Sequence, residues 1–207
     1  MGGRPDPRGA PMIAGLFRRA NARRRAVEEL HVALSMAARR PGLYTRLGVP
    51  DTVEGRFESL CLHTILVLRR LNRLPAPAAE VAQDLVNSVF TQLDASLREL
   101  GVGDMGVSKR MKKLGAAFYG RAEGYDAALN AGDTAALRAV LSRNVLGGEG
   151  DGAGLAAYVR AADAALAGAD LDGLLGGGPP FPEPDGFAPA SARAADATAR
   201  DATGGMA

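Results

Sequence analysis

Residues 55–74 read GRFESLCLHTILVLRRLNRL, and their apolar side chains surround nearly the whole circumference of a helix. A helix that is apolar on every side is normally buried at the centre of a domain, because each face needs an apolar neighbour. Pro50 restricts the preceding residue to an extended conformation, and either Asp51 or Thr52 can cap the helix start. Pro75 and Pro77 follow its end. The stretch therefore predicts the central helix of an all-helical domain.

The rest of the chain surrounds this helix with further helical patterns and no strand-like alternation. Ala and Leu dominate the apolar residues, Trp is absent, and such a composition favours helices over sheets. The 207 residues predict an all-α fold, a single compact helical domain of about six helices over residues 12–175. The flanking segments 1–11 and 176–207 are rich in Gly, Pro and small polar residues, so we expect disordered N- and C-terminal tails.

The content of reactive side chains argues against catalysis. The chain has one cysteine and two histidines, too few for a disulfide or for a zinc site without carboxylates. GxSxG, HExxH and P-loop motifs are all missing. We therefore expect no enzyme, no cofactor, no metal and no small-molecule substrate. His63, in the most apolar helix, is interpreted as a core residue, with haem ligation as the alternative.

The longest apolar run, Leu60 to Leu68, has 9 residues, against roughly 20 for a membrane span. No signal-peptide pattern opens the sequence. The expected location is the bacterial cytoplasm, with peripheral contact at the inner membrane, or the matrix side of that membrane in a mitochondrial relative.

Charge is distributed unevenly along the chain. Residues 1–50 carry 10 Lys or Arg and 3 Asp or Glu, whereas residues 151–207 carry 3 and 8. Two clusters are candidates for contact with ribosomal RNA or acidic lipid headgroups, and the alternative for both is a solvated helix face. Their members are Arg23, Arg24 and Arg25 in the first helix, and Lys109, Arg110, Lys112 and Lys113 in the fourth.

Four short strings carry a family resemblance. They are GVPDT at 48–52, GRF at 55–57, REL-GVGD at 98–104 and AFYGRAEGYDAAL at 117–129. In this order and combination, residues 27–145 resemble the ubiquinol–cytochrome c chaperone family. The resemblance implies a helical, non-enzymatic assembly chaperone that binds newly made cytochrome b and assists biogenesis of respiratory complex III. Mitochondrial relatives act near the ribosomal tunnel exit with a small partner protein, so the implied partners are cytochrome b, the ribosome and such a protein. A ribosome- or RNA-binding module acting through basic helix faces is the alternative function.

Client binding needs exposed apolar surface with a polar rim. The apolar loop of residues 43–50 is the first candidate, and its alternative is a lid folded over the core. The polar candidates have structural alternatives in helix capping, turn formation, ion pairing and close helix packing beside Gly120. The predicted client- or partner-binding residues are Leu43, Tyr44, Leu47, Val49, Pro50, Asp51, Thr52, Arg56, Arg98, Glu99, Asp104, Tyr119 and Arg121.

Overall fold

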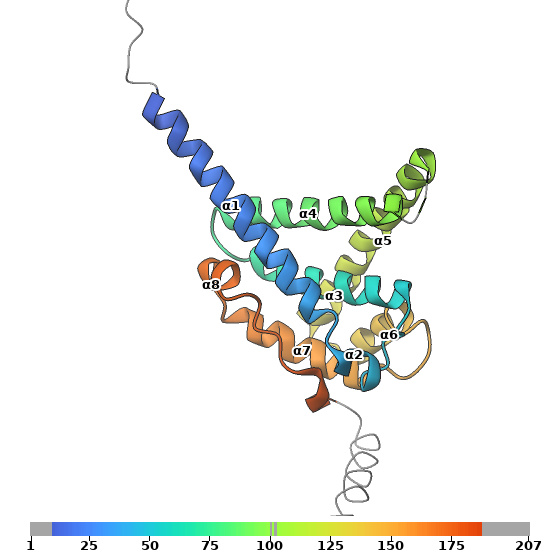
Figure 1. Cartoon of the computed structure of the whole chain (residues 1–207). Coiled ribbons are helices and arrows are strands. Elements are labelled where there is room, and N and C mark those ends of the chain that lie inside the picture. The colour runs from blue at the N-terminus through green and yellow to red at the C-terminus, as the bar shows by residue number, and fades with distance from the viewer. Residues whose placement is uncertain (1–9, 100, 102, 188–207) are drawn as a thin grey trace, which may run out of the picture.

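The computed structural model describes residues 10–99, 101 and 103–187, with side chains from residue 21 onward, and every regular element in these ranges is helical (Figure 1). This confirms the predicted all-α fold. The elements are α1 (Ala10–Ala37), α2 (Pro41–Thr45), α3 (Val53–Leu71), α4 (Ala78–Glu99), α5 (Asp104–Ala131), α6 (Thr134–Asn144), α7 (Ala153–Ala167), α8 (Leu171–Gly176) and a short 3₁₀ helix, η1 (Pro184–Phe187).

Helix α3 lies at the centre of the bundle and contacts α1, α4, α5 and α7. Every residue from Cys61 to Val67 is buried, as its continuous apolar circumference predicts. In Figure 1, α1 crosses in front of α4, and α7 packs along the opposite side of the bundle. The central position that residues 55–74 predicted for this helix is therefore the observed one.

The start of α3 explains two of the strings in the sequence. The Thr52 hydroxyl accepts a hydrogen bond from the Gly55 backbone N–H at 3.0 Å, so Thr52 is the N-cap. A Cβ atom on Gly55 would lie 2.0 Å from the Pro50 carbonyl oxygen. Only glycine allows the loop to pass this close to the first turn of the helix.

A buried arginine ties three helices together near the other end of α3. Arg69 is 7% exposed, and its guanidinium donates to Asp163 on α7 at 2.9 Å and to Asp126 on α5 at 2.5 Å. Charge-assisted bonds to two carboxylates satisfy a group that would be costly to bury alone. This arrangement fixes α5 and α7 relative to the central helix.

The C-terminal half of α4 and the N-terminal half of α5 form a projecting arm, defined here as the described residues between 90 and 117. The buried residues of α4 end at Val89, and those of α5 begin at Phe118 apart from Val107 in its first turn. The arm extends away from the bundle and ends at the right of Figure 1. Its helices are longer than the core that they cover, so their faces near the tip meet solvent.

The packed part of the chain continues further than its composition predicts. The expected tail began at residue 176, but residues 177–187 lie against the bundle as a strap, whose Phe181 is 7% exposed. The Arg40 guanidinium donates to the carbonyl oxygens of Phe181 at 3.0 Å and Pro182 at 2.9 Å. The expected disorder of residues 1–9 and 188–207 concerns residues outside the described ranges, and α1 begins at Ala10.

The strap covers a buried polar pair. His63 Nδ1 lies 2.7 Å from the Ser59 carbonyl oxygen, which can only accept, so Nδ1 carries the proton. Its Nε2 therefore accepts from the Tyr158 hydroxyl at 2.8 Å, and the Phe181 ring stacks edge-on at 4.8 Å. Both ring nitrogens are engaged inside the core, which corresponds to the core interpretation of His63 rather than haem ligation.

Candidate functional site: a groove between α3 and the arm

The apolar loop before α3 folds inward. Leu43, Leu47 and Val49 are 0%, 5% and 3% exposed, so they belong to the hydrophobic core. The Tyr44 side chain is half-buried, and its hydroxyl donates to the Ala38 carbonyl oxygen at 2.7 Å. These contacts correct the prediction that the loop forms an apolar client surface. The loop instead folds over the core as a lid, which was the alternative interpretation. The reason is that each apolar side chain finds a neighbour in the bundle.

The polar residues beside this loop are structural in part. Thr52 caps α3, while Asp51 accepts a hydrogen bond from Arg56 Nε at 2.7 Å on the exposed surface. Pro50 is half-buried. An exposed pair of this kind contributes little to stability. Both side chains are exposed, so Asp51 and Arg56 are accessible to a partner.

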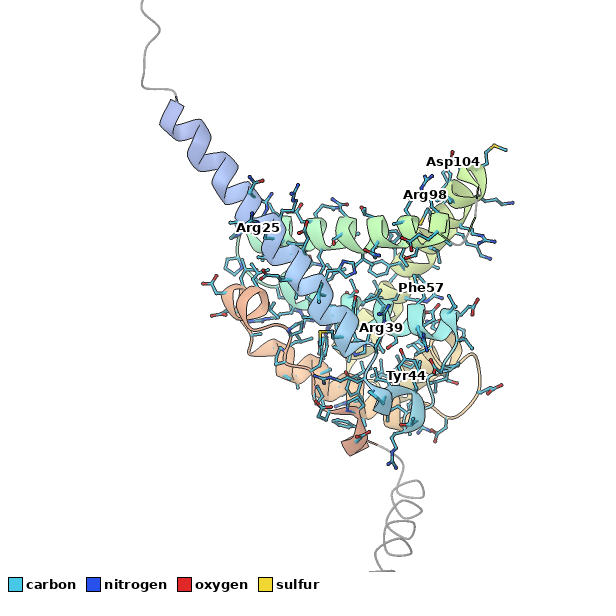
Figure 2. All side chains as sticks on the ribbon, viewed as in Figure 1. Arg25, Arg39, Tyr44, Phe57, Arg98 and Asp104 are labelled. Carbon is cyan, nitrogen blue, oxygen red and sulfur yellow. The ribbon has the colours of Figure 1, made fainter. Side chains whose placement is uncertain are left out.

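The predicted polar residues at the arm tip form a local cluster of ion pairs. Arg98 pairs with Asp94 at 2.6 Å and also with Asp104, so it joins the end of α4 to the start of α5. Glu99 is exposed beside it. Figure 2 shows Arg98 and Asp104 at the outer end of the arm, with Phe57 beneath the arm near the bundle. These ion pairs hold the two helices of the arm together, which corresponds to the structural alternative of turn formation.

A groove of about 560 Å³ opens where the arm leaves the bundle, between the start of α3 and the facing sides of α4 and α5. Its floor is apolar and half-buried, and its rim is charged. Its lining residues are Val53, Glu54, Phe57, Glu58, Leu93, Ser96, Leu97, Arg110, Lys113, Leu114, Ala117 and Arg121.

One ion pair closes the inner end of this groove. Arg121 donates to both carboxylate oxygens of Glu58, at 2.6 and 2.5 Å, and both side chains are largely buried. Burial raises the pKa of the Glu58 carboxyl, and the Arg121 charge opposes that rise. The bidentate geometry fixes α5 against α3, so the groove has a rigid end. Tyr119, the neighbour of Arg121 in sequence, is 61% exposed on a different side of α5.

The structure brings together residues that the sequence assigned to separate tasks. Arg121, predicted for client contact, shares the groove with Arg110 and Lys113, which were predicted for an anionic surface. Lys109 and Lys112 lie on the exposed side of α5. The sequence analysis missed the apolar floor because apolar residues at helical spacing are typical of a core. The lining residues that it missed, apolar and polar together, are Val53, Glu54, Phe57, Glu58, Leu93, Ser96, Leu97, Leu114 and Ala117.

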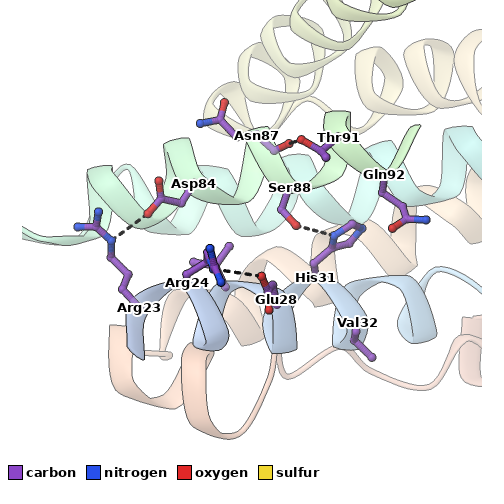
Figure 3. A pocket seen from close by; sticks show the side chains of 11 residues that line it. Arg23, Arg24, Glu28, His31, Val32, Asp84, Asn87, Ser88, Thr91 and Gln92 are labelled. Carbon is purple, nitrogen blue, oxygen red and sulfur yellow. Dashed lines mark hydrogen bonds and ion pairs between the residues drawn. The ribbon is translucent and has the colours of Figure 1, made fainter. Parts of the chain in front are cut away.

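A second hollow, of about 710 Å³, lies between α1 and α4 and is lined mostly by polar side chains (Figure 3). Arg23 pairs there with Asp84 at 2.9 Å and with Glu80, and Arg24 lies 3.6 Å from Glu28. Arg25 is exposed on the neighbouring side of α1. Because local carboxylates neutralise much of this arginine cluster, it offers less net positive charge than its sequence predicts.

His31 and Ser88 join the two helices across this hollow. His31 Nδ1 lies 2.8 Å from Ser88 Oγ, and burial lowers the pKa of the imidazole. No carboxylate of the described residues pairs with the second ring nitrogen, so the pair lacks the third group that orients a nucleophile and base. The described residues also contain no group of three or more His, Cys, Asp or Glu side chains placed to hold a metal ion.

Within the described ranges, none of the helices combines the length and the apolar character that a membrane span requires. The features above define an all-helical domain that presents an apolar groove at the base of a projecting arm. A family model described as ubiquinol-cytochrome C chaperone matches residues 45–181. The chain belongs to this family, which confirms the resemblance seen in the four strings. The match extends through α7 and α8, beyond the region those strings covered.

A solved structure gives the same result. The chain is similar to the crystal structure of the Cbp3 homolog from Brucella abortus, with 38% sequence identity and a TM-score of 0.74. The alignment covers 84% of this chain and 98% of that chain. No significant match was found among curated proteins. The family and the structural relative together support a chaperone linked to complex III assembly.

Proposed function

We propose that this chain is a non-enzymatic assembly chaperone for complex III that holds newly made cytochrome b in the groove between α3, α4 and α5. The observation that carries the proposal is this groove in a member of the ubiquinol-cytochrome C chaperone family. The lid loop is closed over the core, so the groove is the better candidate for a client surface.

The floor of the groove suits an apolar helix. Phe57, Leu93, Leu97 and Leu114 are each half-buried, so they keep apolar area that a client can cover. An amphipathic or apolar helix in such a groove is a common mode of polypeptide recognition. Burial contributes about 25 cal/mol per Å² before the costs of association, so the affinity for a client would come from the apolar area that it covers.

The rim of the groove adds an electrostatic preference. Arg110 and Lys113 stand on α5 at its open side and are both exposed. The last turn of a client helix carries partial negative charge on its free carbonyl groups, and these cations are placed to meet it. At the inner end, Glu58 and Arg121 neutralise each other, which supports a binding role rather than proton transfer.

Deletion of the gene tests the proposed function. We expect complex III and its b-type haem signal to be lost from the membranes, while the terminal oxidases persist, because the client would be degraded before assembly. The measurement is reduced-minus-oxidised spectroscopy with activity assays of each complex, and complementation with the wild-type gene is the control. Normal complex III in the deletion strain would contradict the proposal.

A further inference from the structure

We propose that the outward side of the arm docks on an anionic lipid bilayer. The contact surface, here called the basic face, consists of Met105, Lys109, Lys112 and Tyr119 on α5. Their spacing of four, three and seven residues places them along one side of the helix. This contact is separate from client binding in the groove and does not depend on it.

The cations of the basic face have no local counter-charges. Among the described residues, neither Lys109 nor Lys112 lies within ion-pair distance of a carboxylate, and both side chains are exposed. The neighbouring Lys113 is likewise unpaired. By contrast, carboxylates engage Arg98 at the tip and Arg121 at the base of the arm. Unpaired cations on a projecting helix attract an anionic membrane surface, each by about a factor of five in affinity.

Two exposed apolar side chains bracket these lysines. Met105 is 89% exposed at the tip, and Tyr119 is 61% exposed toward the base. The Tyr119 ring packs edge-on against Phe118 at 5.6 Å, so it is held in place on the surface. Tyrosine rings favour the headgroup region, and a methionine can enter the boundary with the acyl chains. An RNA backbone offers the thioether no comparable partner, so the combination favours a bilayer over RNA.

The residues on this side between Lys112 and Glu123 include two small ones, Ala116 and Gly120. Ala116 is exposed, and a Cβ atom on Gly120 would meet nothing within 4 Å. Gly120 therefore has no packing role inside the described part of the fold. Glu123 is the acidic residue of this side, and it lies beyond Tyr119 at the end away from the tip. The part of α5 that carries the lysines thus keeps its positive charge.

The basic face and the groove use different sides of α5. The groove residues Leu114, Ala117 and Arg121 follow their own helical row, with Lys113 between the two. Docking through the basic face would therefore leave the groove uncovered and close to the bilayer surface. A bound chain would present its groove where a membrane protein leaves or enters the lipid.

Flotation of the purified full-length chain with lipid vesicles tests the proposal. The assay contains no client protein, so it measures membrane binding alone. We compare vesicles of phosphatidylcholine alone with vesicles that also contain phosphatidylglycerol. The wild type is expected to prefer the anionic vesicles and to release them as salt shortens the screening length. The double variant K109Q/K112Q is expected to lose about 25-fold in affinity for them. Met105→Ser is expected to lose about fivefold.

A matched control removes the same charge elsewhere. R73Q/R143Q neutralises two exposed arginines, one just after α3 and one on α6, and it should bind like the wild type. Equal vesicle binding by K109Q/K112Q and the wild type would overturn the proposal. The proposal would also be overturned if the two lysines were needed for binding single-stranded RNA while the wild type showed no preference for anionic vesicles. Phe57→Asp, a variant of the groove, should still bind vesicles. Vesicle binding therefore tests this proposal independently of the proposed client binding.

Discussion

Replacing Phe57 with aspartate is expected to reduce co-purification of cytochrome b at least about tenfold. Phe57 is half-buried on the groove floor, so its ring is available for a client to cover. Loss of that contact alone removes on the order of 2 kcal/mol, and an unpaired carboxylate facing an apolar helix adds a desolvation cost. Leu97→Asp, on the opposite wall of the groove, should have the same effect. The measurement is affinity capture of the chain from detergent-solubilised membranes, followed by detection of cytochrome b.

Met36→Asp is the matched control for these variants. Met36 is a large apolar side chain, 70% exposed on α1 and outside the groove lining. The same change of charge there should leave cytochrome b capture near the wild-type level. Thermal unfolding of all three variants checks that the fold survives. Equal losses in Phe57→Asp and Met36→Asp would show that the groove has no special role.

The free energy of unfolding is expected to fall by about 3 kcal/mol between pH 6.5 and pH 4 through His63 alone. Burial lowers the pKa of His63 from 6.5 to about 4, with a smaller contribution from the Arg40 charge, while the hydrogen bond to the Ser59 carbonyl opposes the shift. The folded state therefore keeps the imidazole neutral when the unfolded state already binds a proton. Stability is complete above pH 6.5 and declines as the pH falls toward 4.

Urea unfolding at a series of pH values measures this effect. Other groups also titrate below pH 5, so the informative quantity is the difference between the wild type and His63→Gln in how the free energy of unfolding depends on pH. His63→Gln should be less stable at pH 7, because it disturbs the bonds to Ser59 and Tyr158. Its stability should nevertheless depend less on pH. His31→Gln is the control, since His31 is only half-buried and should account for less of the slope. Parallel curves for the wild type and His63→Gln would contradict the account.

The sequence was most informative where one physical requirement decided the structure. Residues 55–74 need apolar neighbours on all sides, and α3 is the central helix. Thr52 was one of two candidate caps, and the geometry at Gly55 shows that it is the cap in use. For such elements the local pattern and the tertiary structure agree, which is why the fold class followed from the sequence.

The strap could not be predicted in the same way. Residues 177–187 have the Gly and Pro content of a disordered tail, and apart from the four-residue η1 they form no helix whose periodicity could be read. Its position depends on a few specific contacts far apart in sequence, such as Arg40 with the Phe181 carbonyl and the Phe181 ring with His63. Nothing in the local composition identifies those partners.

The groove was missed for a related reason. Phe57, Leu97 and Leu114 occur at helical spacing, and a helical pattern does not distinguish a core face from a groove. The difference arises because the arm extends beyond the bundle, so its inner faces diverge from α3. The loop of Leu43, Leu47 and Val49 shows the opposite case, since its isolated apolar residues indicated a surface and are instead buried.

Photo-crosslinking in living cells tests the central claim most directly. A photoreactive amino acid placed at Leu97, on the groove wall, should form a crosslink to newly synthesised cytochrome b, whereas the same group at Met36 should form none. A crosslink to cytochrome b at Met36 but not at Leu97 would contradict the claim that the groove between α3 and the arm holds the client.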